Sequence, residues 1–96
     1  MKDKEIYQRK IQAQLDEWRA DIDKLKARAS GAGADSQLEI NKNLRILESK
    51  VEEGKEKFLE ISRYGEAAWD SASESVRSGW ESVKSEANDA LTKLKR

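Results

Sequence analysis

The chain has no cysteine, no histidine and no proline among its 96 residues. Without cysteine there is no disulfide framework, no thiolate nucleophile and no thiolate metal site. Without histidine the chain lacks the commonest general base, the usual metal ligand and the residue that most often activates a catalytic serine. Proline breaks helix interiors, so its absence permits very long helices.

Long apolar runs and strand patterns are missing as well. No apolar stretch reaches the roughly 18 residues of a membrane-spanning helix, and the charged first 30 residues lead us to expect no signal peptide. β-branched residues are few and do not alternate, so we expect an all-α protein. Charged residues make up 40% of the chain, and the formal net charge is zero. A zero net charge argues against a partner that is a nucleic acid, because such binding depends on neutralising phosphates.

What the chain does have is an apolar ladder at helical spacing that ends in an 11-residue repeat. Three series share this spacing: Phe58, Trp69, Trp80 and Leu91; Ile61, Ala72, Val83 and Leu94; and Gly65, Val76 and Ala87. Eleven residues make three helical turns, so all of them fall on one side of a helix. The ten members other than Gly65 are defined as the apolar stripe, and they are our candidate interaction residues.

The ladder predicts one helical domain over residues 1–96. A first helix is expected over residues 3–29, because its apolar residues alternate steps of four and three in the manner of a coiled-coil seam: Ile11, Leu15, Trp18, Ile22, Leu25 and Ala29. Residues 30–35 contain two glycines and are the expected loop. A second helix is expected over residues 37–63, with Ser36 and Glu39 forming a capping box at its start.

The short loop favours an antiparallel hairpin of these two helices. Folding the chain back about residue 33 pairs the two ladders as Leu25 with Ile40, Ile22 with Leu44, Trp18 with Leu47, Leu15 with Val51 and Ile11 with Gly54. In this register Gly54 leaves room for Ile11. The hairpin covers the second helix only to about residue 61, since the first helix is too short to reach further.

Two arrangements are open for the C-terminal third. The chain can break near Gly65 and fold back over residues 66–94 as a three-helix bundle, which the similar helix lengths favour and which a cap at Ser71–Glu74 would assist. Alternatively the second helix runs on to about residue 94. The local sequence Glu66-Ala67-Ala68-Trp69 tips the balance toward the continuous helix, because a lone glycine is a weak break. A continuous helix would expose Trp69 and Trp80 on a monomer, so we then expect an oligomer.

No residues form a recognisable catalytic, cofactor-binding or metal-binding motif. Gly31 and Gly33 lack the lysine and the flanking strand of a phosphate loop. Acidic pairs such as Glu52 and Glu53 are expected on a solvated helix face, away from any cleft. We therefore expect no enzyme, no cofactor and no small-molecule substrate.

Two functions remain. The first is a non-enzymatic interaction protein that acts through the apolar stripe, by self-association or by binding a protein partner. The second is a coat on lipid or apolar granules, because 11-residue amphipathic repeats suit adsorption to surfaces. Charge disfavours the lipid partner: residues 66–90 carry six acids against two bases, whereas a helix on anionic lipid needs basic residues beside its apolar side.

Three segments carry a family resemblance: Tyr7-Gln-Arg-Lys-Ile11-Gln-Ala-Gln-Leu15-Asp-Glu-Trp18, Gly65-Glu-Ala-Ala-Trp69 and Gly79-Trp80-Glu-Ser-Val83. With them the chain resembles a family of small bacterial coiled-coil proteins, which are described as stress-response proteins and were first noted in cyanobacteria. The likeness spans nearly the whole chain. It implies a cytoplasmic helical protein and supplies no catalytic residues. The 11-residue period is also similar to that of late embryogenesis abundant proteins and apolipoproteins, although the serines here replace their lysine-rich pattern.

Overall fold

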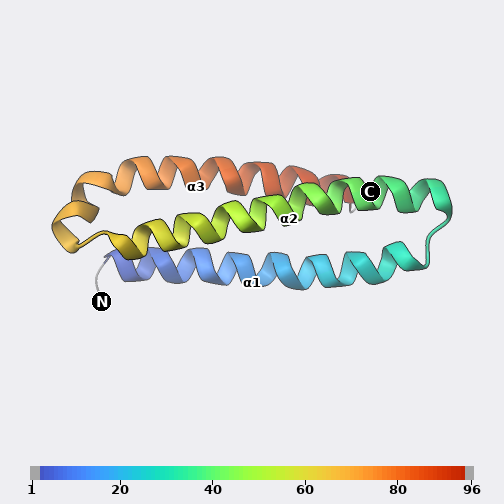
Figure 1. Ribbon diagram of the computed structural model, residues 1–96, viewed down its shortest axis with the longest axis horizontal. Helices are drawn as coiled ribbons and strands as arrows, with labels where there is room; N and C mark the ends of the chain where they lie inside the picture. Colours follow the sequence, from blue (N-terminus) through green and yellow to red (C-terminus); the bar gives the residue numbers. More distant parts are fainter. Residues whose placement is uncertain (1–2, 95–96) are drawn as a thin grey trace.

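The computed structural model describes residues 3–94, which form three helices side by side (Figure 1): α1 (Asp3–Ser30), α2 (Ala34–Arg63) and α3 (Glu66–Leu94). The bundle is 53 Å long and 18–19 Å across. α2 runs antiparallel to both neighbours, so α1 and α3 are parallel. The all-α prediction is confirmed, in its folded-back form. The observed helix bounds lie close to the predicted ones, except at the start of α2.

The chain breaks at Tyr64 and Gly65, so the preference for a continuous helix was wrong. Tyr64 is extended (φ −85°, ψ 134°) and its N–H donates to the carbonyl of Ile61. The Gly65 carbonyl accepts the first bond of α3, from the Trp69 N–H. α3 therefore begins before Ser71, and the cap predicted there lies inside the helix. The local preference for helix is overridden because folding back buries the whole apolar side of α3. Burial of each large apolar side chain stabilises the fold by about 1.5–3 kcal/mol.

α2 also begins earlier than predicted. Gly33 occupies its N-cap position, with its carbonyl accepting from the Gln37 N–H at 2.8 Å and no side-chain cap. The capping box of Ser36 and Glu39 is therefore wrong. Ala34 and Asp35 extend the helix backwards, and an acidic residue in the first turn is favoured by the helix dipole.

The register of α1 against α2 differs from the predicted pairing by one step of the ladder. Gly54 lies against Leu15, not Ile11: a Cβ on Gly54 would be 2.6 Å from Leu15 Cδ2. The amide of Gln8 donates to the Ser62 hydroxyl at 2.8 Å, which fits the same shift. Two heptad ladders can pair at several registers. Here α3 contributes to the choice, because a Cβ on the same glycine would also be 3.1 Å from the Trp80 ring. The first turns of α2 consequently reach past the end of α3 (Figure 1).

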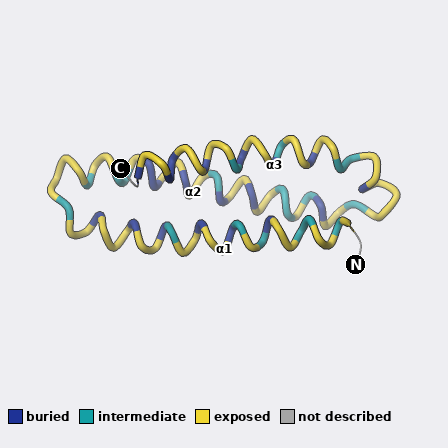
Figure 2. The backbone as a smooth tube through the Cα atoms, turned by 180° about the vertical axis from the view of Figure 1, so that it is seen from behind, coloured by how far each residue is buried: buried dark blue, intermediate teal, exposed yellow. Residues whose placement is uncertain are grey.

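α2 packs closely against both α1 and α3, whereas α1 and α3 approach each other closely at few points. The wider α1–α3 interface is filled by two aromatic pairs, Tyr7 with Trp69 and Trp18 with Trp80, whose ring centroids are 5.8 and 5.5 Å apart. Both pairs join residues 62 positions apart, because Tyr7 and Trp18 share the 11-residue spacing of α3. The buried residues lie on the sides of the helices that face one another (Figure 2).

Candidate interaction surface

The apolar stripe is the inner side of the bundle. Eight of its ten residues are at most 7% exposed and pack in the core: Ile61, Trp69, Val76, Trp80, Val83, Ala87, Leu91 and Leu94. Phe58 and Ala72 are partly buried. In the folded chain the α3 part of the stripe is therefore covered by α1 and α2 of the same molecule, and a partner could reach it only if α3 moved away.

Trp80 lies at the centre of the buried contacts. Its ring packs on Trp18 from α1 and on the backbone of Gly54 from α2. The 11-residue repeat indicated Trp80, but the role of Gly54 in receiving it was missed, since the sequence suggested Ile11 as its neighbour. Trp18 is 1% exposed and its Nε1 has no hydrogen-bond partner. An unpaired buried N–H lowers the free energy of unfolding by about 1–3 kcal/mol, so this group offsets part of the stabilisation from packing.

A second aromatic contact lies near the break between α2 and α3. Arg77 of α3 places its guanidinium carbon 5.4 Å from the centroid of the Tyr7 ring, in a cation–π contact. The Tyr7 hydroxyl is buried and has no hydrogen-bond partner among residues 3–94. Burial raises the pKa of Tyr7 above its usual value near 10, the charge of Glu81 raises it further, and Arg77 opposes both. An open groove beside this ring is lined by Asp3, Ile6, Tyr7, Lys10 and Arg77.

Polar contacts at both ends and the middle of the bundle help to hold α3 beside the other helices. Near the break, Lys4 of α1 donates to the Tyr64 carbonyl. Midway, Lys50 of α2 pairs with Glu86 of α3, and the pKa of Lys50 is raised by its hydrogen bond to Glu86 and, less strongly, by that to Glu53. At the far end, Arg28 donates to the Leu94 carbonyl at 2.8 Å. These contacts add to the apolar packing that holds α3 on the hairpin.

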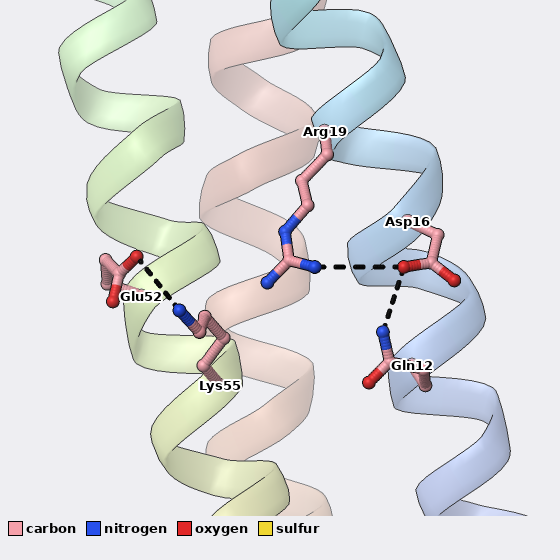
Figure 3. Close-up of polar contacts among 5 residues, drawn as sticks. All are labelled: Gln12, Asp16, Arg19, Glu52 and Lys55. Carbon is pink, nitrogen blue, oxygen red and sulfur yellow. Dashed lines mark hydrogen bonds and ion pairs between the residues drawn. The ribbon is translucent and has the colours of Figure 1, made fainter.

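The outer surface consists of solvated helix faces. Figure 3 shows Gln12, Asp16 and Arg19 on α1 and Glu52 with Lys55 on α2, each set bonded within its own helix. The two ion pairs are 3.9 and 3.6 Å long and exposed. Each therefore adds only about a few tenths of a kcal/mol to the stability of the fold. Glu52 and Glu53, which were predicted to lie on a solvated face, are both exposed.

The exposed large apolar residues do not join into one patch. Ile6 lies near the start of α1, while Leu38, Ile46 and Leu59 are spread along α2. Leu38 is the most exposed, at 66%, because the first turns of α2 extend past α3. The exposure of Leu38 could not be predicted from the local pattern, because it follows from the register of the helices.

Within residues 3–94, no group of three or more acidic, histidine or cysteine side chains is placed to hold a metal ion. None of the helices in that range is both long and apolar enough to cross a membrane. Comparison of the chain with protein-family models, curated proteins and solved structures gives no match. What the chain does must therefore be inferred from its own residues.

Proposed function

We propose that this chain is a non-enzymatic helical interaction protein, and that its apolar stripe binds another protein segment when α3 leaves the α1–α2 hairpin. The observation that carries the proposal is the contrast on α3. Its inner side holds Trp69 and Trp80, each 4% exposed, whereas its outer side is charged. Apolar packing holds it on the hairpin, and a connection of two residues joins it to α2. A cytoplasmic, stress-associated role is part of the proposal and rests on the sequence resemblance alone.

The chemistry of the stripe indicates the kind of partner. Trp and Leu side chains bind well in apolar environments, and tryptophan is enriched where proteins bind one another. The outer side of α3 is acidic, so the released helix stays soluble and presents one apolar side only. An apolar segment exposed by a heat-damaged protein fits such a surface.

The test ties α3 to the hairpin. Because the chain has no cysteine, Lys50→Cys and Glu86→Cys introduce the only two thiols, and a short bis-maleimide applied in dilute solution joins α2 to α3. The matched control joins Lys50→Cys to Glu53→Cys, which lie within α2 and also contact each other.

The measurement is light scattering from a heat-labile enzyme warmed with each protein. We expect the control to suppress aggregation and the α2–α3 cross-linked protein to lose this effect. Equal suppression by both would show that release of α3 is not needed and would overturn the proposal.

One observation favours the second function, a coat on lipid or apolar granules. α1 and α3 carry aligned 11-residue series, with Tyr7 and Trp18 matching Trp69 and Trp80. Opening the bundle would therefore expose two such helices to a surface. Adsorption predicts that vesicles of brominated phosphatidylcholine quench tryptophan emission. Emission that stays constant with lipid would count against the coat and leave the protein partner.

A further inference from the structure

We infer that a second copy of this chain is a partner of the apolar stripe, through exchange of α3 between two molecules. In the exchanged dimer, α2 and α3 of each chain join into one helix over residues 34–94, and each α3 packs on the hairpin of the other copy. This inference rests on the proposed use of the stripe and names one partner for it.

The connection between α2 and α3 favours this exchange. Tyr64 and Gly65 both have negative φ, so the connection holds no turn that only glycine could form. Gly65 stands at the N-cap of α3, as its carbonyl accepts the first helical bond, and glycine has no side chain to cap a helix. Joining the helices would give backbone partners to the last carbonyls of α2 and to the first N–H groups of α3.

The apolar ladder also stays in phase across the break. From Leu47 to Leu94 it runs through Val51, Gly54, Phe58, Ile61, Gly65, Trp69, Ala72, Val76, Trp80, Val83, Ala87 and Leu91 in steps of three and four. The mean step is close to the 3.6 residues of a helical turn. Folding back does not require the apolar positions of α2 and α3 to stay in helical phase across the break. A joined helix does require it, because only then does the whole stripe lie on one side.

All the contacts that α3 makes with the hairpin can re-form between two chains. Gly54 faces Trp80, Lys57 faces Gly79 and Lys50 pairs with Glu86. These antiparallel pairs are centred near residues 67–68, so the two joined helices of a dimer would cross there.

Three small residues lie close to this crossing, Gly65 and Ala72 of the ladder and Ala68 beside it, next to Trp69. Gly65 and Ala68 are exposed in the single chain, and a Cβ on Gly65 would meet nothing within 4 Å. Small residues let two helix backbones approach closely, so we expect a new contact at the crossing.

Two hinge variants shift the exchange in opposite directions. Gly65→Ala favours helix at the connection between α2 and α3, because alanine has the higher helix propensity and is a poorer N-cap for α3 than glycine. We therefore expect dimer association about 30-fold tighter, which corresponds to about 2 kcal/mol for the two connections of a dimer. Glu66→Pro suits the first residue of α3 but breaks a joined helix, so we expect a monomer. Light scattering after size exclusion measures the mass against the 10.9 kDa of one chain.

A mixing experiment identifies the packing. The Lys50→Cys chain and the Glu86→Cys chain are mixed at high concentration and treated with the short bis-maleimide. Exchange predicts a covalent dimer, because α2 of one copy lies on α3 of the other. A mixture of the Lys50→Cys and Glu53→Cys chains is the control and should give none.

The inference is overturned if Gly65→Ala stays monomeric, or if a dimer forms that Glu66→Pro does not weaken and the mixture does not cross-link. Its failure is distinguishable from failure of the proposed function. A strictly monomeric chain that still suppresses client aggregation, and loses this when α3 is tied down, retains the function without the exchange.

Discussion

At the scale of single residues, replacing two glycines inside helices with alanine should change stability in opposite directions. Gly54 is enclosed, since a Cβ there would lie 2.6 Å from Leu15 and 3.1 Å from Trp80. Gly79 faces only the flexible end of Lys57, at 3.1 Å. We predict that Gly54→Ala lowers the free energy of unfolding by about 1–2 kcal/mol despite its better helix propensity. Gly79→Ala, the matched control, should raise it by up to about 1 kcal/mol. Urea unfolding of both variants decides this, and equal stability would contradict the close packing at Gly54.

Tyr7 allows a second prediction, because its buried hydroxyl has no hydrogen-bond partner within the described part of the chain. Tyr7→Phe removes this group and keeps the ring against Trp69, so we expect the free energy of unfolding to rise by about 1 kcal/mol. The pKa of Tyr7 is raised in the folded protein, so as pH rises past about 10 the unfolded chain loses its proton first and stability falls.

The measurement for Tyr7→Phe is urea unfolding at neutral pH and above about pH 10. Wild type should lose more stability on this change than the variant does. Lys50, whose pKa is also raised, titrates in both proteins and cancels in the comparison. Identical pH dependence would mean that Tyr7 is not held in its neutral form by the fold.

At the scale of the helices, the start of α2 gives a prediction that separates the observed cap from the expected one. Gly33 has φ −66° and ψ 164°, which other residues adopt without strain, and a Cβ there meets nothing within 4 Å. Gly33→Asp should therefore cap α2 and raise the free energy of unfolding by about 0.5–1 kcal/mol. Ser36→Ala should leave the melting temperature unchanged. A clear loss with Ser36→Ala would restore the capping box.

The extent of α1 could be read from the sequence, since the apolar spacing and the glycine loop marked its ends closely. The break at Tyr64 and Gly65 could not, because the local residues favour a helix and the decision comes from burial of Trp69 and Trp80 far along the chain. The register of α1 against α2 could not be predicted for a related reason. Gly54 packs against Leu15 of α1 and Trp80 of α3 together, so the register depends on the third helix. The stripe itself was predicted from its period, while its cover by α1 and α2 required the fold.

At the scale of the whole molecule, the parallel helices α1 and α3 share one repeat. Tyr7 and Trp18 face Trp69 and Trp80 at the same offset of 62 residues, so the 11-residue spacing of α1 is hidden within its heptad-like steps. A repeat of 11 residues has 3.67 residues per turn, close to a straight helix. Two straight helices with one period can meet in equivalent aromatic layers, and α2 fills the antiparallel position between them.

This arrangement predicts that α3 can be supplied by a separate chain. Residues 1–63 and residues 64–96 should each be poorly helical alone, because unpartnered amphipathic helices are marginal in water. Mixing them should give more helix by circular dichroism than the sum of the parts, since Trp80 again finds Trp18 and Gly54. A second fragment with Trp80→Ala loses about 3–5 kcal/mol of packing and should restore little helix. If mixing adds no helix with either fragment, α3 packs only within its own chain, and both its release to a protein partner and its exchange between copies lose their physical basis.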